Sequence, residues 1–446
     1  MFAQHRENIA KAFPHDLVFL KGGESECKFD SDTDIKFRQE SNFYYLTGCL
    51  EPDCCCLIDC ENKEFTFFAP LFTLDDELWI GHKKSLQEQK EMYNATRCLS
   101  LQEMPAFLEK MKDRTCHVIL DIPQIKNAEL PFTNIKNDLQ PAIAELRVIK
   151  DEKELEDLKI SCEINAKAFN YTMSHFKAGM KEYEAEAMHA YIYLKHGARF
   201  PSFCAITAAG SNASTLHFVD NVHTAEPDTV FEIDAGCEYR NACSDCTRTF
   251  PTGERFTKKQ EELYNVVLAC QKKGIEMAAP GVKWEDVHMA CLGVLLEGLR
   301  KYGIVKKEGD FDEQMKVGIP SIFQPHGLGH LLGLNTHDVG GYNDQIKKST
   351  DPRLRYLRTR RTLAPGMVIT VEPGLYFIQG FIDLAKKNPD QAKHINFDVL
   401  EAYQKECGGY RIEDDIVITE NGCRVLPGAA KELNEIYALR KIAYAE

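Results

Sequence analysis

Residues 230–250 read Val230-Phe-Glu-Ile-Asp234-Ala-Gly-Cys-Glu-Tyr-Arg-Asn-Ala-Cys-Ser-Asp245-Cys-Thr-Arg-Thr-Phe250, and this stretch has the pattern of two strands joined by a turn. Two runs of apolar, aromatic and β-branched residues flank a turn-like Tyr-Arg-Asn at 239–241. We predict an antiparallel hairpin centred on that turn, with Asp234 and Asp245 opposite each other. Carboxylates that face each other across a ladder repel, so a cation between them would stabilise the pair; two aspartates that face solvent are the alternative.

The segments on either side of this hairpin alternate between helical and strand patterns. Apolar residues at helical spacing predict long helices, at Glu152–Phe176, Glu182–His196 and Lys258–Met277. Short apolar runs between turn signals predict strands, at Thr229–Ile233, Arg248–Phe250, Val368–Val371 and Ile416–Thr419. Strands grouped with helices outside them are typical of an α+β layer architecture.

The first third of the chain alternates short strand-like runs with polar helical segments, which favours a smaller α/β domain. Its predicted strands are Leu17–Leu20, Asn42–Leu46, Cys54–Ile58, Phe65–Phe68 and His117–Leu120. A charge-rich passage at 146–159 then leads into a long helix, so we place a domain boundary near Arg147. A chain of 446 residues exceeds the usual size of one hydrophobic core, and we predict two domains, 1–147 and 148–446.

The composition disfavours several classes of partner and compartment. A net charge of −14 disfavours nucleic acid and anionic membrane surfaces, and it suits a metal ion or a small substrate. The chain has 17 cysteines, an odd number, and some are adjacent rather than spaced as in a disulfide framework. The first residues show no secretory signal, and no run of about 18 apolar residues occurs in the sequence. We therefore expect a cytoplasmic protein that binds neither nucleic acid nor a membrane.

A glycine-rich segment carries three histidines within twelve residues, Pro325-His326-Gly-Leu-Gly-His330-Leu-Leu-Gly-Leu-Asn-Thr-His337. Glycine lets the backbone approach a ligand closely, and histidine is the commonest metal ligand. A single histidine is more often a core or surface residue, but three together favour a site. The zinc-protease pattern His-Glu-x-x-His is absent, because Gly-Leu-Gly separates the first two histidines.

Two further segments place carboxylates at strand ends. Glu372 ends the apolar run Val-Ile-Thr-Val and precedes a Pro-Gly turn. Period-two alternation puts Arg411 and Glu413 on one face of a strand. Taken separately, each glutamate is more often an exposed rim residue, so neither segment predicts a site by itself.

These acids and one histidine form a sensible ligand set for two metal ions. Four carboxylates and an imidazole balance the four positive charges of two divalent cations and leave room for a bridging hydroxide. Oxygen-rich ligation favours manganese over a thiolate-bound zinc. Cys243-Ser-Asp-Cys246 has no second pair that would complete a structural zinc site, so we reject that alternative. The set consists of Asp234, Asp245, His330, Glu372 and Glu413.

In order and local sequence, these segments resemble the pita-bread metallopeptidases, and within them the eukaryotic-type prolidases, the Xaa-Pro dipeptidases. The resemblance rests on Asp followed by Asp eleven residues later, His-Gly-Leu-Gly-His, Val-Glu-Pro-Gly and Arg-Ile-Glu-Asp. It extends to residues 22–24 and 37–48, so it covers nearly the whole chain. It implies a C-terminal pita-bread (creatinase/aminopeptidase-like) catalytic domain, a smaller N-terminal α/β domain of the aminopeptidase P/prolidase type, and a homodimer.

The resemblance also implies a role for each matching residue. Asp234 would bind one metal, and Asp245 and Glu413 would bridge both. His330 and Glu372 would complete the second metal, and Glu372 would also act on the proton of the attacking water. The residues implied in catalysis are Glu372, His326 and His337, and those implied in substrate binding are His217, His326, His337, Arg358 and Arg411.

Arg358 and Phe203 bear on specificity and rate. The planar guanidinium of Arg358 would pair with the free carboxylate of a dipeptide. Without the resemblance, the arginines crowded around it would favour a solvated charge run. Phe203 stands where the family generally has Tyr, so a hydroxyl that would help to orient a metal-bound carboxylate is missing.

The implied function is hydrolysis of dipeptides that end in proline with two divalent ions, Mn²⁺ first, with Co²⁺ or Zn²⁺ as alternatives. The ions would lower the pKa of a bridging water, and the hydroxide would attack the carbonyl carbon before proline. Aminopeptidase P, which removes the first residue from longer Xaa-Pro peptides, is the nearest alternative; Arg358 and the insertion at 378–409 favour the dipeptidase. A non-catalytic binding module of the same fold is the remote alternative, since such proteins lose ligands that this chain keeps.

Overall fold

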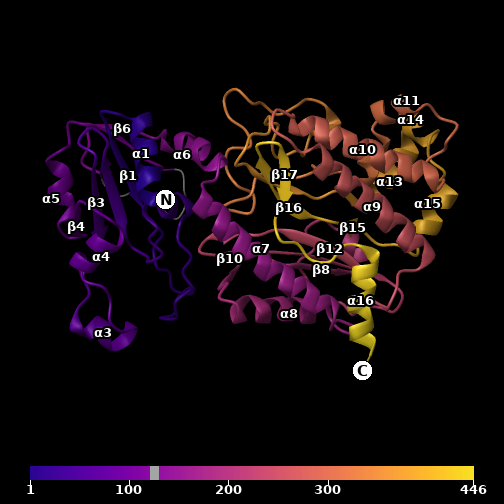
Figure 1. Cartoon of the computed structure of the whole chain (residues 1–446), viewed down its shortest axis with the longest axis horizontal. Coiled ribbons are helices and arrows are strands. Elements are labelled where there is room, and N and C mark those ends of the chain that lie inside the picture. Colours follow the sequence, from indigo (N-terminus) through magenta and orange to yellow (C-terminus); the bar gives the residue numbers. More distant parts are fainter. Residues whose placement is uncertain (121–129, 446) are drawn as a thin grey trace. The chain divides into compact units, whose positions relative to one another are not determined.

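The computed structural model describes residues 1–120 and 130–445, which form two compact units, Met1–Arg147 and Val148–Glu446 (Figure 1). Both units combine helices with strands, so the predicted α+β class is confirmed. Within the described ranges, no helix is both long and apolar enough to cross a membrane.

The strands of the smaller unit are β1 (Leu17–Lys21), β2 (Cys55–Asp59), β3 (Glu64–Ala69), β4 (Arg97–Ser100), β5 (Thr115–His117) and β6 (Asn134–Lys136). They form one sheet with the order β4-β3-β2-β1-β5-β6. β1, β2 and β3 are antiparallel neighbours, whereas β4, β5 and β6 pair in parallel with the strand beside them. The helices are α1 (Phe2–Ala12), α2 (Ser41–Thr47), α3 (Leu74–Ile80), α4 (Leu86–Met92), α5 (Met104–Glu109) and α6 (Leu139–Val148).

Three predicted strands of this unit are confirmed to within one residue at each end, namely those that form β1, β2 and β3. The predicted strand His117–Leu120 is wrong beyond its first residue, because β5 ends at His117. The chain leaves the sheet there, and the Leu120 N–H donates to the side chain of Asn137 (2.9 Å) rather than to a neighbouring strand.

The predicted strand Asn42–Leu46 is instead part of the helix α2. The Glu40 carboxylate accepts a hydrogen bond from the Phe43 N–H (2.7 Å) and so caps the start of the helix. Gly48 ends it in the left-handed conformation, with φ at 72°. Every residue of α2 is buried, so no polar face interrupts the apolar run. A short helix that is buried on all sides has the same sequence pattern as a buried strand.

The strands of the larger unit are β7 (Phe200–Pro201), β8 (Ile206–Ala209), β9 (Val230–Ala235), β10 (Cys237–Tyr239), β11 (Ala242–Cys243), β12 (Cys246–Pro251), β13 (Val368–Val371), β14 (Gly374–Leu375), β15 (Tyr410–Arg411), β16 (Asp414–Thr419) and β17 (Gly422–Val425). They form small sheets, of which β8-β9-β12 and β13-β16-β17 build the centre. An isolated bridge between Thr247 and Glu413 joins these two sheets. The predicted strands of this unit correspond to β9, β12, β13 and β16.

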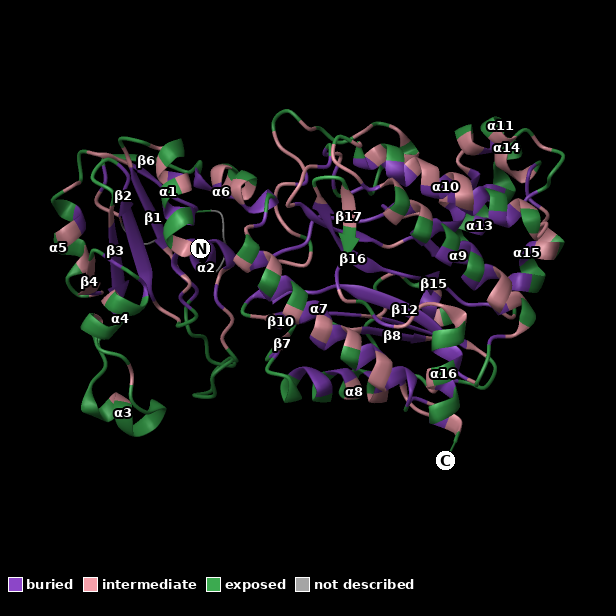
Figure 2. Cartoon of the chain, in the orientation of Figure 1, coloured by how far each residue is buried: buried purple, intermediate pink, exposed green. Residues whose placement is uncertain are grey.

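The helices of the larger unit are α7 (Glu152–Met173), α8 (Glu182–Lys195), α9 (Lys258–Met277), α10 (Trp284–Lys301), α11 (Phe311–Lys316), α12 (Ile319–Phe323), α13 (Gln379–Lys387), α14 (Pro389–Ala392), α15 (Phe397–Gln404) and α16 (Leu433–Tyr444), with 3₁₀ turns η1 (Gly210–Ser214) and η2 (Pro352–Leu354). α7 packs against α8, and α9 packs against α10 (Figure 1). Figure 2 shows most of the strands between these helix pairs buried, with β17 partly exposed, whereas the helices expose their outer faces. The predicted helices α7, α8 and α9 are confirmed, and α7 ends three residues earlier than predicted.

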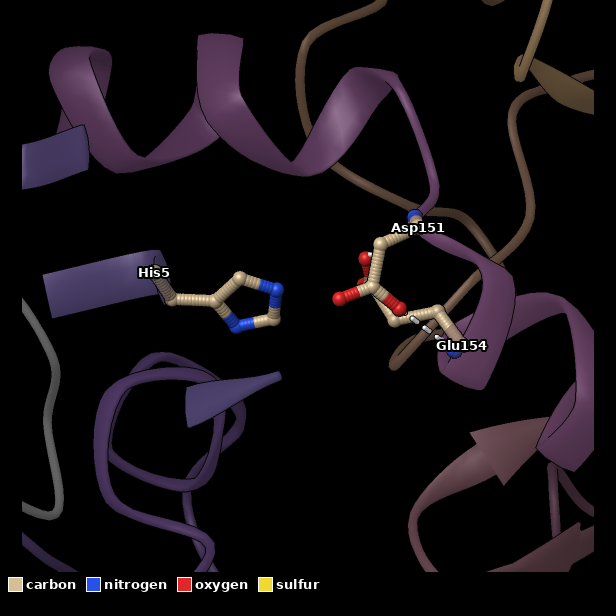
Figure 3. Close-up of side chains that lie close together, drawn as sticks. All are labelled: His5, Asp151 and Glu154. Atoms are coloured by element: carbon tan, nitrogen blue, oxygen red, sulfur yellow. Dashed lines mark hydrogen bonds between the residues drawn. The ribbon is translucent and has the colours of Figure 1, made fainter. Parts of the chain in front are cut away.

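The start of α7 shows why its sequence forms a helix. The Asp151 carboxylate accepts a hydrogen bond from the Glu154 N–H (2.8 Å), which is drawn dashed in Figure 3. The Glu154 carboxylate accepts one from the Asp151 N–H (3.0 Å) and completes a capping box. α9 begins in the same way at Thr257 and Gln260. These caps position two long helices against the central sheets.

A buried histidine on α8 makes the larger unit sensitive to acid. The Nδ1 atom of His189 lies 3.0 Å from Thr172 Oγ1 and 3.1 Å from the Ala185 carbonyl oxygen. Burial lowers the pKa of His189 from 6.5 to about 4. The unfolded chain therefore binds more protons than the folded chain between these two values, and stability is lost as the pH falls through this window. The loss is about 2 kcal/mol at about pH 5.

We therefore expect His189→Gln to reduce the fall in the free energy of unfolding between pH 7 and pH 5. Urea denaturation of the wild type and the variant at both pH values measures this difference. A variant that loses as much stability as the wild type would contradict the role of His189.

Candidate metal centre

The hairpin predicted within residues 230–250 is present, but its register differs from the prediction. β9 and β12 are antiparallel, with Asp234 opposite Thr247 rather than opposite Asp245. Asp245 lies just before β12, so the two carboxylates are diagonal neighbours. The reason is the turn, where Arg240 and Asn241 both have left-handed backbone, with φ at 51° and 63°. A turn with two such central residues sets a register that the sequence pattern alone does not determine.

Asp245, His330 and Glu413 meet in the interior of the larger unit. One ligand atom from each residue lies within 4.8 Å of the other two, and all three side chains are buried. His330 Nε2 is 3.3 Å from Asp245 Oδ2 and 3.6 Å from Glu372 Oε1, so Glu372 belongs to the same cluster. The bridge between Thr247 and Glu413 brings the two carboxylate-bearing segments together.

Asp234 is held beside this cluster by Arg411. The Nη2 atom of Arg411 donates to Asp234 Oδ2 (2.8 Å), and its Nη1 atom donates to the Tyr376 hydroxyl (2.8 Å) and lies 3.1 Å from Glu232 Oε1. Arg411 is buried and engaged by these groups. The structure thus brings all five predicted metal ligands to one place. Arg411 donates to one of them, Asp234, and the contact of Arg411 with substrate stays a prediction.

Several carboxylate oxygens of the cluster have no hydrogen-bond partner among the described residues. Asp234 Oδ1, Asp245 Oδ1 and Glu413 Oε1 are all buried and unpartnered. Burial, followed by the charges of neighbouring carboxylates, raises the pKa of Asp245 and Glu413 well above the usual range. Burial also raises the pKa of Glu372, although nearby basic groups oppose this shift. Acids that are so costly to ionise fit a site that divalent cations fill, because the cations offset the repulsion.

Comparison with known proteins agrees with this geometry. Residues 156–420, which include all the predicted ligands, match the model of metallopeptidase family M24. The chain belongs to metallopeptidase family M24. It is therefore a metallopeptidase, and residues 2–119 match the N-terminal domain of aminopeptidase P. The pita-bread catalytic domain with a smaller N-terminal domain, expected from the resemblance, is confirmed.

Relatives of two kinds match this M24 chain over nearly its full length. A probable Xaa-Pro aminopeptidase from Paracoccidioides brasiliensis is 38% identical over 435 residues, which cover 95% of this chain and 92% of the relative. The Xaa-Pro dipeptidase of Homo sapiens is 35% identical over 459 residues, which cover 98% and 92%. The solved structure of the Pseudomonas aeruginosa aminopeptidase PepP matches with a TM-score of 0.84 and 28% identity, over 100% of this chain and 98% of that chain.

The two predicted catalytic histidines of this M24 chain lie against the cluster of predicted ligands. The ring of His337 packs edge to face on the ring of His330, with 4.5 Å between centroids. His326 Nδ1 is 3.8 Å from Glu372 Oε2 and 2.8 Å from the Gly327 carbonyl oxygen. Burial, followed by nearby positive or titratable groups, lowers the pKa of His326 and of His337 to about 3. Both imidazoles are therefore neutral at pH 7 and do not repel a cation in the site.

The two other predicted substrate residues, His217 and Arg358, are exposed. His217 lies on the loop after η1, and Arg358 lies on the loop after η2. Burial is the largest cause of the low pKa of His337, and the charges of His330, Arg358 and His217 lower it further. The loops that carry His217 and Arg358 therefore both lie near the His337 ring.

Residues outside the predicted set hold the ligands in place. Thr247 Oγ1 donates to Glu413 Oε2 (2.7 Å) and accepts from Arg411 Nε (3.1 Å). Asp415 Oδ2 accepts from the backbone N–H of Asp245 (3.0 Å). The sequence analysis missed these residues, although polar residues inside buried strands are a signal that could have identified them.

Arg248 fixes the backbone of both central sheets. Its side chain is fully buried, and Nη1 donates to the carbonyl oxygens of Thr247 (2.9 Å) and Glu413 (2.6 Å). Its Nη2 atom donates to Asp414 Oδ1 (2.6 Å), which offsets the cost of burying the charge. Arg248 therefore holds together the segments that carry Asp245 and Glu413 without bonding to the carboxylates of these two residues.

Phe203 lies half-buried in the loop between β7 and β8. Its ring offers no hydroxyl to a carboxylate, and the hydrogen bonds that reach Glu413 and Asp234 come from Thr247 and Arg411. The effect of Phe203 on metal affinity or rate stays a prediction.

We expect Thr247→Val to weaken metal binding by about tenfold to a hundredfold, because it removes the hydroxyl that orients Glu413 and that accepts from Arg411. Equilibrium dialysis against manganese measures the change. Thr207→Val on β8 is a matched control, since the Thr207 hydroxyl is buried but has no hydrogen-bond partner in the described part of the chain. Equal affinities for the two variants would contradict the orienting role of Thr247.

Proposed function

We propose that the chain is a metal-dependent Xaa-Pro dipeptidase, which hydrolyses the bond before a C-terminal proline. The observation that carries this proposal is the position of Arg358. Its side chain is exposed, with no hydrogen bond or ion pair to any described residue. Burial is the main cause of the low pKa of His337 and of the raised pKa of Glu372, and the charge of Arg358 lowers both pKa values. A free guanidinium beside the ligand cluster is a fitting partner for the carboxylate that ends a dipeptide.

Two of the neighbouring arginines do not share this freedom. Arg353 pairs with Asp351 (2.6 Å), and Arg360 pairs with Glu285 (2.5 Å). Arg355 is exposed as well, with its guanidinium 5.3 Å from the centroid of the Tyr356 ring. The segment is therefore not a uniformly solvated charge run, the alternative that its sequence context favoured. Arg358 is the proposed anchor because its charge acts on His337 and Glu372.

Each residue of the site has a separate role in the proposed hydrolysis. Two divalent cations, when bound, lower the pKa of a water molecule and stabilise negative charge on a carbonyl oxygen. Glu372 would accept a proton from the attacking water and deliver it to the proline nitrogen. His337, which is neutral, can donate an N–H hydrogen bond to the substrate backbone. The single N–H of neutral His326 is directed at the Gly327 carbonyl oxygen (2.8 Å), and its Nε2 lies 3.0 Å from the Tyr376 hydroxyl, so His326 would contact the substrate through its ring. Proline has no N–H and a fixed φ, so recognition through its carboxylate by Arg358 replaces recognition through that donor.

We further propose manganese as the metal, with cobalt or zinc as alternatives, because four of the five proposed ligands are carboxylates. The homodimer and the cytoplasmic location remain predictions. Light scattering of the purified protein and fractionation of cells that express it would test them.

An Xaa-Pro aminopeptidase is the second candidate, favoured by the relatives of that name and by the solved aminopeptidase structures that match the whole chain. Metal-free protein titrated with manganese, and assayed on an Xaa-Pro dipeptide and an Xaa-Pro-Xaa tripeptide, separates the two. We expect a higher kcat/KM for the dipeptide and full activity at two ions per chain. Faster cleavage of the tripeptide would favour the aminopeptidase instead.

A further inference from the structure

The segment that carries Arg358 is fastened to the segment that follows His337. We propose that Tyr342, together with Gly341, is a positioning residue for Arg358 and thereby sets the preference for dipeptides over longer peptides. This inference rests on the proposed function, because it concerns the same carboxylate anchor.

Two hydrogen bonds hold the backbone on either side of Arg358. The Tyr342 hydroxyl donates to the carbonyl oxygen of Leu357, the residue before it. Thr359 Oγ1, from the residue after it, donates to the Gly341 carbonyl oxygen (3.1 Å). Leu357 and Thr359 are buried, whereas Arg358 between them is exposed. The backbone of Arg358 is thus fixed while its side chain points away from the core.

The same contact leaves no room for a side chain at two glycines. A Cβ atom on Gly341 would lie 2.4 Å from the Arg358 carbonyl oxygen, and one on Gly327 would lie 2.8 Å from Leu357 Cα. Atoms of the backbone cannot move aside as the end of a flexible side chain can. Gly327 directly follows His326, so the backbone beside Arg358 packs against both histidine-bearing segments.

The segment that carries Arg358 is therefore held against the segment that follows His337 by the contacts of Gly341 and Tyr342. An exposed arginine side chain rotates freely, so its reach to a substrate is set by where its backbone lies. A dipeptide places a carboxylate one residue beyond the bond that is cut, whereas a tripeptide places a neutral amide there. A shift of the Arg358 backbone should therefore weaken the binding of dipeptides and leave the binding of tripeptides almost unchanged.

Tyr342→Phe tests this inference, because it removes only the hydroxyl that holds the Leu357 carbonyl. We expect KM for an Xaa-Pro dipeptide to rise about threefold to tenfold, as for the loss of one hydrogen bond, with kcat, metal content and tripeptide hydrolysis unchanged. Tyr403→Phe is the matched control: the Tyr403 hydroxyl donates to Glu262 (2.6 Å), away from the ligand cluster. This control should leave every quantity at the wild-type value.

Gly341→Ala is the stronger variant, because its methyl group would displace the Arg358 carbonyl. We expect a loss of at least about tenfold in dipeptide kcat/KM, again with metal content unchanged. If this variant fails to fold, Tyr342→Phe decides the matter alone. Equal losses for dipeptide and tripeptide, or a fall in kcat without a change in KM, would overturn the inference.

The outcome also separates this inference from the proposed function. If the wild type prefers tripeptides, or if Arg358→Ala leaves the dipeptide KM unchanged, the proposed function fails. If the wild type and Arg358→Ala behave as proposed but Tyr342→Phe changes nothing, only the positioning role of Tyr342 fails.

Discussion

Asp245→Asn is expected to lose metal and to reduce peptide hydrolysis by at least about a thousandfold. Asp245 Oδ2 lies 3.3 Å from His330 Nε2, and its Oδ1 is buried with no hydrogen-bond partner among residues 1–120 and 130–445, so the carboxylate stands at the centre of the predicted ligands. The amide would remove one negative charge and would direct a donor group at a cation. Elemental analysis after dialysis and kcat/KM at saturating manganese measure the two effects.

The stability of the metal-free protein distinguishes this effect from misfolding. Burial and neighbouring acids raise the pKa of Asp245, so replacing it should leave the metal-free variant at least as stable as the metal-free wild type. Asp59→Asn is a suitable control: Asp59 is buried in the smaller unit and pairs with Arg114, so its loss should lower stability but leave metal content intact. An Asp245→Asn protein that keeps its full metal content would contradict the assignment.

Arg358→Ala is expected to raise KM for Xaa-Pro dipeptides by about thirtyfold to a hundredfold while kcat and metal content stay the same. The size corresponds to the loss of charge-assisted hydrogen bonds, each worth about 1.5–3 kcal/mol. Tripeptide hydrolysis should change little, because a tripeptide has no carboxylate at that position. Steady-state kinetics on both substrates give these values.

Two controls make this test sharper. Arg355→Ala removes an exposed arginine from the same segment and should leave the kinetics unchanged; the Arg355 guanidinium lies 5.3 Å from the centroid of the Tyr356 ring. An Xaa-prolinamide lacks the carboxylate, so it should bind weakly to the wild type and be insensitive to Arg358→Ala. If Arg358→Ala weakened the amide and the acid equally, the anchoring role would be wrong.

The grouping of the five proposed ligands could be predicted from the sequence for a physical reason, and their role in binding metal stays a prediction. Asp234, Asp245 and Glu372 each interrupt or end an apolar run, and buried strands seldom carry acids without a partner. The long helices were equally predictable, because their apolar spacing extends over many turns. Both sequence patterns, an acid within or at the end of an apolar run and apolar residues at helical spacing, involve residues that are close together in the sequence.

Where the structure differs from the prediction, the sequence pattern is ambiguous, or the deciding contact lies in a turn or far along the chain. α2 has the apolar run of a buried strand, because a helix that is buried on all sides shows no polar face. The hairpin register depended on the backbone of Arg240 and Asn241. The support from Thr247 to Glu413 crosses 166 residues of sequence, and no local pattern reports such a contact.

The distance in sequence between the proposed ligands has a consequence for how the protein is made. Asp234 lies near the middle of the chain, whereas Glu413 precedes β16, close to the end. A ribosome adds residues one at a time from the N-terminus, so Asp234, Asp245 and His330 emerge well before Glu413. An early ion would meet an incomplete ligand set. We therefore expect metal acquisition after translation, so that the cations available to the finished chain determine which ion is loaded.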